Sequence, residues 1–169
     1  GKGRVYATGL TDSRKDFPLR WAMQMWYGGG EDDVFITCLK PDGTGLEYST
    51  YLGGEDFDEG YGITVDEECR AVVVGMTASR SYPVTADASQ RERGDRSFPI
   101  TSGEGFVARL SSNGRVLEYS TFLGGLDMDE IDHVRRTEDG FVVAGRTCAG
   151  DFPTTAGAVQ AQDLGPRDP

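Results

Sequence analysis

Short runs in which apolar and polar residues alternate recur along the chain. Clusters of Gly, Asp and Asn separate these runs, which in the first half cover residues 34–39, 47–52, 61–65 and 71–75. A period of two is typical of half-buried β-strands, whereas an amphipathic helix has a period of 3.6. Asp42-Gly43 and Asn113-Gly114 suit tight hairpin turns, because these residue types adopt positive φ at low cost. The pattern predicts short antiparallel strands joined by hairpins.

The pattern is also duplicated. Residues 34–59 match residues 105–130 at an offset of 71, and Val73-Val74-Gly75 matches Val143-Ala144-Gly145 at an offset of 70. A truncated third copy opens the chain at residues 5–11. A meander of four strands repeated in tandem is the sequence signature of a propeller blade. The sequence therefore predicts an all-β partial propeller of four-stranded antiparallel blades, with about two complete blades plus a strand of a third.

This interpretation divides the chain into four parts. We expect the end of a preceding blade and a connection at 1–30, a blade at 31–102 with an inserted loop at 91–103, a second blade at 103–160, and a tail or linker at 161–169. Closed propellers generally need at least four blades. Other copies, further repeats of a longer polypeptide or a partner are therefore expected to cover the exposed faces and edges. An open two-sheet sandwich built from the same strands is the alternative architecture.

Several segments together resemble a known family. The chain is similar to the bacterial β-propeller repeats called SBBP repeats, on the basis of FVARL, LEYSTFLGG, GYGITVD, VVVGMT, VVAGRT and DFPTTAGAVQ. The sequence departs from the repeat at Glu67-Glu68-Cys69-Arg70, at residues 131–135 and in the inserted loop. The resemblance implies propeller blades in a secreted or cell-surface protein, which would be extracellular, exposed at the cell surface or periplasmic.

Composition and charge limit the classes of partner that the chain is expected to bind. With 37% hydrophobic and 27% charged residues and 24 Gly, the chain is globular and rich in turns, and no run approaches 18 apolar residues. The net charge of −11 repels phosphate backbones, which argues against nucleic acid as a partner. Twelve carboxylates and the single base Lys40 lie within residues 31–68. This local acidity favours a partner with a basic patch.

One acidic pattern occurs twice, and two interpretations of it stay open. The pattern Gly-Gly-x-Asp-x-Asp-Glu occurs at residues 53–59 and 124–130. It contains the candidate calcium ligands Asp56, Asp58, Glu59, Asp127, Asp129 and Glu130. Carboxylates that alternate along a loop can direct several oxygens at calcium, which accepts flexible oxygen ligation. Alternatively, Asp56 and Asp127 accept backbone N–H bonds within a turn. The second interpretation is favoured, because the run lacks the full calcium-loop pattern.

The candidate partner-binding residues lie in two connections. The inserted loop supplies Arg91, Arg93, Arg96 and Phe98, and the first connection supplies Trp21 and Trp26. Loops on a rigid scaffold commonly carry recognition, and aromatic and Arg side chains anchor interfaces. The alternatives are a tolerated surface insertion for the loop and gap-filling between blades for the tryptophans.

The sequence contains few residue patterns that are typical of a catalytic site or a zinc site. Cys38, Cys69 and Cys148 form neither a CxxC pair nor a cluster with His133, so a structural zinc site is not expected and the pairing of the three thiols stays open. No GxSxG motif or isolated carboxylate pair marks a nucleophile or an acid/base couple.

The sequence therefore predicts a non-catalytic module outside the cytoplasm for protein or glycan recognition or scaffolding, with calcium as an optional ligand of the acidic turns. The alternatives are a structural subunit of a larger complex that completes the partial propeller and, third, a fragment of a polysaccharide-active enzyme.

Overall fold

A computed structural model describes residues 3–94 and 103–162 of the chain. These residues form nine strands and no helix. In chain order the strands are β1 (Val5–Thr11), β2 (Asp33–Leu39), β3 (Leu46–Leu52), β4 (Asp58–Val65), β5 (Ala71–Thr77), β6 (Glu104–Leu110), β7 (Leu117–Leu123), β8 (Asp129–Arg136) and β9 (Phe141–Thr147). The all-β prediction is confirmed. Among the described residues, no helix has the length and apolar character needed to cross a membrane.

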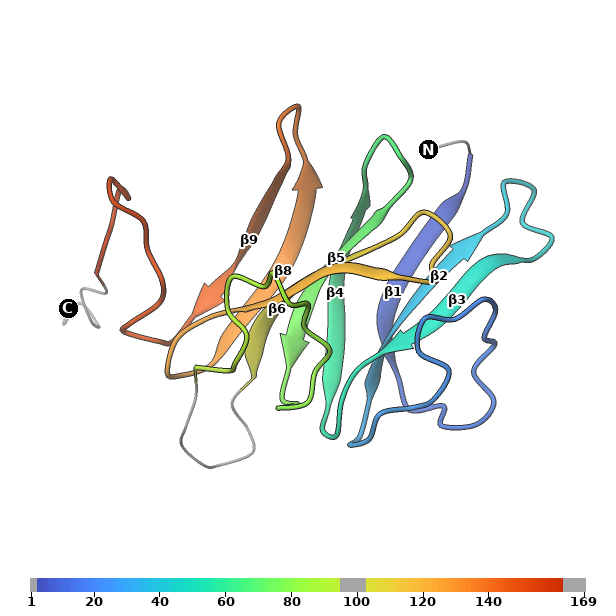
Figure 1. The fold of residues 1–169 in the computed structure, drawn as a ribbon, viewed down its shortest axis with the longest axis horizontal. Helices are drawn as coiled ribbons and strands as arrows, with labels where there is room; N and C mark the ends of the chain where they lie inside the picture. Colours follow the sequence, from blue (N-terminus) through green and yellow to red (C-terminus); the bar gives the residue numbers. More distant parts are fainter. Residues whose placement is uncertain (1–2, 95–102, 163–169) are drawn as a thin grey trace, which may run out of the picture.

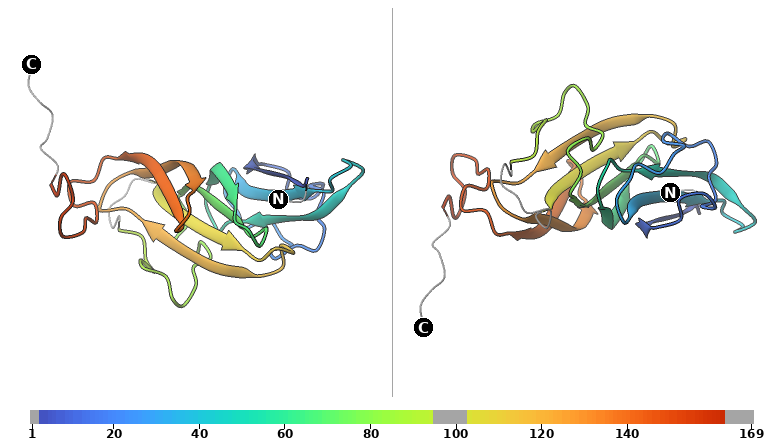
Figure 2. Two further views of the ribbon diagram at one scale, coloured as in Figure 1. Left: turned by 90° about the horizontal axis from the view of Figure 1, so that it is seen from above. Right: turned by 90° about the horizontal axis from the view of Figure 1, so that it is seen from below.

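The strands form three antiparallel sheets that follow one another along the long axis of the molecule (Figures 1 and 2). The first sheet has the order β1-β2-β3, the second β4-β5-β6-β7 and the third β8-β9. β4 packs on β1 and β2, and β8 packs in the same way on β5 and β6. The sheets are thus stacked by a packing arrangement that repeats.

The sheets are out of phase with the predicted blade boundaries. The segment 31–102 contributes β2 and β3 to the first sheet but β4 and β5 to the second, and residue 103 lies between two strands of one sheet. The described strands therefore form one sheet of four strands, flanked by sheets of three and two, instead of two complete four-stranded units. The physical reason is that Gly53-Gly54 and Gly124-Gly125 turn the chain out of one sheet and into the next, whereas β5 stays hydrogen-bonded to β6 across its long connection.

The predicted hairpin turns are present. Gly43 and Gly114 have φ values of 69° and 72°, the left-handed region that glycine adopts without a Cβ penalty. Each turn is closed by a backbone bond, from the Gly43 N–H to the Lys40 carbonyl (2.9 Å) and from the Gly114 N–H to the Ser111 carbonyl (2.9 Å). These turns fix the register of β2 with β3 and of β6 with β7.

The hydrophobic core lies between the first and second sheets. Its fully or almost fully buried members come from both sheets and from the connection after β5: Val34, Ile36, Cys38, Tyr48, Leu52, Ala71, Val73, Tyr82, Phe106, Ala108, Leu110 and Phe122. Tyr82 packs on the rings of Phe106 and Phe122, with centroids 4.7 and 6.0 Å apart. The connection therefore belongs to the core, and it holds the residues that follow it in place.

Candidate functional site

Each repeated acidic pattern forms a corner where the chain passes between sheets. In the first corner the Gly54 N–H donates to Asp58 Oδ2 (2.7 Å). In the second, the Gly125 N–H donates to Asp129 Oδ2 at the same distance of 2.7 Å. Both aspartates are buried and open their strands, β4 and β8. The sequence pattern predicts these carboxylates on a loop, but a β-bulge in each strand lets pairing continue to Asp58 and Asp129.

The turn residues before these strands behave as the favoured interpretation predicts. Asp56 Oδ1 accepts the Phe57 N–H, and Asp127 Oδ1 accepts the Met128 N–H, both at 2.9 Å. Carboxylates that accept local N–H groups satisfy a turn that would otherwise leave donors unpaired. That prediction for Asp56 and Asp127 is confirmed.

A second buried carboxylate joins each corner from the neighbouring strand of the preceding sheet. Asp33 opens β2, and its Oδ2 accepts the Gly28 N–H at 2.6 Å. Glu104 opens β6, and its Oε2 accepts the Gly94 N–H at 3.1 Å. Both side chains have no exposed surface. Each corner therefore holds a pair of buried acids drawn from two strands.

The first glycine of each corner leaves room for its acid pair. A Cβ on Gly53 would lie 2.7 Å from an Asp58 oxygen and 2.9 Å from an Asp33 oxygen. Real Cβ atoms do not approach neighbours so closely. The glycine is thus required by the two carboxylates and not by its own backbone conformation.

A glutamine completes each corner. Gln24 Oε1 accepts the Gly53 N–H (3.2 Å), and Gln90 Oε1 accepts the Gly124 N–H (3.1 Å). The backbone N–H of each glutamine donates to a threonine hydroxyl, at Thr50 (2.8 Å) or at Thr121 (2.9 Å). Buried polar groups need such partners. The glutamines therefore tie the connections that carry them to the outer strands.

Burial also controls the ionisation of the acid pairs. It raises the pKa of Asp33 to about 6 and that of Asp58 to about 7, and the neighbouring Asp33 charge adds to the shift at Asp58. Burial raises the pKa of Asp129 as well. Oδ1 of Asp33, Asp58 and Asp129 is buried and has no hydrogen-bond partner in the described part of the chain. Burial therefore favours the protonated form of Asp33, Asp58 and Asp129.

The other two candidate calcium ligands have partners elsewhere. Glu59 accepts a hydrogen bond from the Tyr61 hydroxyl, and Glu130 pairs with Arg146, whose Nε donates at 2.7 Å. Nowhere in residues 3–94 and 103–162 do three side chains of the metal-ligating types gather into a site. The six acids therefore serve hydrogen bonds and ion pairs within the protein.

The predicted partner-binding residues are dispersed. Arg91 is exposed, and the Arg93 guanidinium donates to the Ala78 carbonyl. Arg96 and Phe98 lie outside the described residues. Trp26 has 68% of its surface exposed.

Trp21 lines a pocket at one end of the first sheet. The pocket has a volume of about 400 Å³ and spans the first sheet and the β6–β7 turn, with the lining residues Arg4, Trp21, Glu47, Tyr48, Ser112, Asn113 and Arg115. The Arg115 guanidinium carbon lies 4.1 Å from the Trp21 ring centroid, and that of Arg20 lies 5.6 Å away. Trp21 has φ of 47°, an uncommon conformation for a bulky residue and one often found at functional sites. Within residues 3–94 and 103–162, the buried Tyr48 hydroxyl at this pocket has no hydrogen-bond partner.

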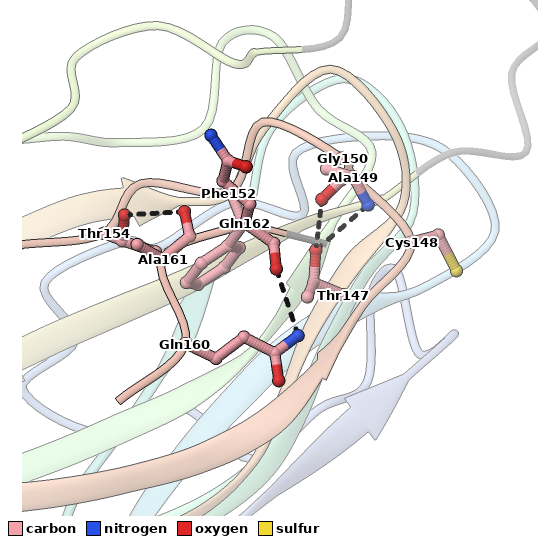
Figure 3. A pocket seen from close by; sticks show the side chains of 9 residues that line it. All are labelled: Thr147, Cys148, Ala149, Gly150, Phe152, Thr154, Gln160, Ala161 and Gln162. Atoms are coloured by element: carbon pink, nitrogen blue, oxygen red, sulfur yellow. Dashed lines mark hydrogen bonds between the residues drawn. The ribbon is translucent and has the colours of Figure 1, made fainter. Parts of the chain in front are cut away.

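A second pocket follows β9 (Figure 3). It has a volume of about 230 Å³ and is lined by Thr147, Cys148, Ala149, Gly150, Phe152, Thr154, Gln160, Ala161 and Gln162. Gln160 occupies the place of Gln90 in the repeat, and its Nε2 donates to the Gln162 carbonyl (3.1 Å) as Gln90 Nε2 donates to the Glu92 carbonyl (3.1 Å). The segment after β9 thus keeps the local hydrogen bonding of the segment after β5.

Comparison with known proteins adds no assignment, because no protein-family model and no curated protein matches the chain. The resemblance to SBBP repeats stays a prediction.

Sequence reasoning missed the residues that complete the corners. Gln90 and Gln160 are repeated in the sequence, and so are the acidic residues Asp33 and Glu104, which precede equivalent strands. This repetition was the available signal. Their roles depend on contacts between segments far apart in sequence, so alternation along one strand could not identify them.

Proposed function

We propose that the chain is a non-catalytic recognition module in which the three sheets are blades of a propeller, one complete and two partial. The repeated packing of β4 on the first sheet and of β8 on the second supports the blade arrangement. The resemblance to secreted repeats is the basis for proposing a location outside the cytoplasm.

The non-catalytic part of the proposal rests on how the acids are used. Asp33, Asp58 and Asp129, whose pKa values burial raises, are enclosed in the corners, and Oδ2 of each accepts a backbone N–H. A general acid or base must reach the proton it transfers. Acids enclosed in this way are structural parts of the fold in our proposal.

The observation that carries recognition is the Trp21 pocket. It combines an exposed aromatic ring with Arg4 and Arg115, against the single carboxylate of Glu47 among its lining residues. Aromatic rings and guanidinium groups recur where proteins hold glycans and peptide segments. The excess of cationic groups selects an anionic ligand. We therefore propose that the pocket binds a carboxylate-bearing glycan or an acidic protein segment.

Tryptophan fluorescence tests this proposal. A hexamer of galacturonic acid and an acidic decapeptide are titrated separately, with a neutral hexasaccharide as the size-matched control. We expect saturable quenching by at least one acidic probe, loss of binding in Trp21→Ala and Arg115→Ala, and retained binding in the control variant Trp26→Ala. The proposal is wrong if neither acidic probe binds, or if Trp21→Ala binds as tightly as the unsubstituted protein.

A structural role as a subunit is the second candidate. It is favoured by the third sheet, in which β9 pairs with β8 alone among the strands that the structure describes.

A further inference from the structure

The chain contains one structural element three times. Each copy is a strand followed by an aromatic-proline pair and then a glutamine, at residues 5–24, 71–90 and 141–160. The strands are β1, β5 and β9. In the first two copies the element lies on a hairpin, β2–β3 or β6–β7, which follows it in the chain. Among the described residues, no hairpin lies on the third copy.

The first two copies show what the element binds. Phe17 packs on Phe35 and Tyr51 with ring centroids 5.3 and 5.4 Å apart, and Tyr82 makes the corresponding contacts with β6 and β7. Gln24 and Gln90 accept N–H groups from the glycines that end the hairpins. Strand, ring and glutamine therefore hold the same hairpin at three separate points.

The strand of each element also has a place for an aromatic ring. A Cβ on Gly9 would lie 2.8 Å from the Phe35 ring, and a Cβ on Gly75 would lie 2.9 Å from the Phe106 ring. Gly145 holds this position in β9. A glycine here lets the ring of a paired strand lie directly against the backbone.

In the third copy each of these points lacks its partner. Val142 is 58% exposed, whereas its equivalent Val72 is 2% exposed. Within the described part of the chain, no aromatic ring packs on Phe152, and the only hydrogen bond of the Gln160 side chain goes to the Gln162 carbonyl. The pocket in Figure 3 lies where the hairpin would pack.

We propose that β9 and the pocket after it form an acceptor site for a β-hairpin of the β6–β7 type, supplied by a partner as an unpaired segment. The hairpin adds to the edge of β9 that pairs with no other described strand, a known mode of peptide recognition. The repeat gives the register, because β5 pairs Met76 with Gly105 and Gly75 with Phe106. In the acceptor, Arg146 faces the glycine of the partner and Gly145 faces its phenylalanine.

The β6–β7 type fits better than the β2–β3 type. The equivalent of Gly105 in β2 is Val34, whose side chain would lie beside the long Arg146 side chain. A second copy of the chain is not the occupant we propose, because its own β2 and β6 are already paired with β1 and β5. The inference rests on the repeated packing and not on the Trp21 pocket, so either proposal can fail alone.

A synthetic peptide tests the proposal on the whole chain. The peptide covers residues 103–125 and is titrated by calorimetry, while hydrogen exchange locates its binding site. We expect saturable binding below about 1 mM with new protection of β9 amides. A peptide with Phe106→Ala and a protein with Gln160→Ala should each bind about tenfold more weakly, a change of about 1.4 kcal/mol. Val159→Ala, at a fully exposed position, is the matched control and should bind normally.

Three outcomes would overturn the proposal. The first is the absence of saturable binding. The second is binding that leaves β9 unprotected or releases protection in β6 and β7, which indicates that the peptide replaces the β6–β7 hairpin on β5. The third is that the Phe106→Ala peptide binds as tightly as the unsubstituted peptide, because the phenylalanine ring would then not pack against Gly145.

Discussion

Replacing Asp58 with asparagine isolates the effect of one buried acid on stability. The Asp58 side chain has no exposed surface, and its Oδ2 accepts bonds from the Gly54 N–H and the Ser79 hydroxyl (2.9 Å). Its Oδ1 has no hydrogen-bond partner among the described residues. Burial raises the pKa of Asp58 to about 7 from an ordinary value of 3.8. The Asp58→Asn side chain keeps the shape and an acceptor oxygen but cannot ionise.

The direction in which pH changes the free energy of unfolding follows from proton binding by Asp58. Between pH 4 and pH 7 the folded protein holds a proton on Asp58 that the unfolded chain has lost, so raising the pH lowers the free energy of unfolding. The contribution is fully present below pH 4 and is lost as the pH rises through about 7. The loss amounts to about 4 kcal/mol, because roughly three pH units separate the two pKa values and each is worth about 1.4 kcal/mol.

Urea unfolding at pH 4.5, 6 and 8 measures this effect. Other acids act in the opposite direction, since bonds from the Thr44 N–H and hydroxyl lower the pKa of Asp42, so the comparison between variants carries the test. Relative to the unsubstituted protein, Asp58→Asn should gain about 3 kcal/mol between pH 4.5 and pH 8, because the rest of the change occurs below pH 4.5. The exposed Asp127→Asn is the control and should follow the unsubstituted protein. A difference between Asp58→Asn and the unsubstituted protein that is constant with pH would refute the reasoning.

Three further predictions concern a close-packed glycine, the aromatic residue of the repeated element and calcium. Gly75→Ala should lower the free energy of unfolding by about 2 kcal/mol or more in urea, because its Cβ would lie 1.9 Å from a backbone oxygen, whereas Gly45→Ala meets nothing within 4 Å and should be nearly neutral. Tyr82→Ala should cost about 3 to 5 kcal/mol, but Phe152→Ala, at the equivalent position without a packed hairpin, should cost far less. Millimolar calcium should leave the melting temperature unchanged, since the corner carboxylates already accept protein hydrogen bonds, and a rise of several degrees would contradict this assignment.

The local elements were predictable because they depend on neighbours in sequence. Alternation located the strands to within a few residues, and Asp42-Gly43 and Asn113-Gly114 marked the hairpins that the structure contains. The start of β4 was placed too late, at Tyr61. The bulge near Gly60 hides the alternation there, so the two preceding acids looked like loop residues.

The division into sheets was not predictable in the same way. A four-strand repeat can be cut at any of its four connections, and the sequence pattern is the same for each choice. The long connection from β5 to β6 suggested a boundary, but Tyr82 anchors it in the core and Gln90 ties it to β7. The short Gly-Gly corners are where the chain changes sheet.

The buried acids of the corners change the interpretation of the acidic stretch at residues 31–68. Its local charge favoured a partner with a basic patch, yet Asp33 and Asp58 lie inside the protein and, with pKa values of about 6 and about 7, are not fully charged at neutral pH. Asp66 is also buried, against Arg70 in the turn after β4. The surface of the folded protein is therefore less acidic there than the residue count indicates. At the Trp21 pocket the cationic groups outnumber the carboxylate, so the attraction we propose there is toward an anionic ligand rather than toward a basic one.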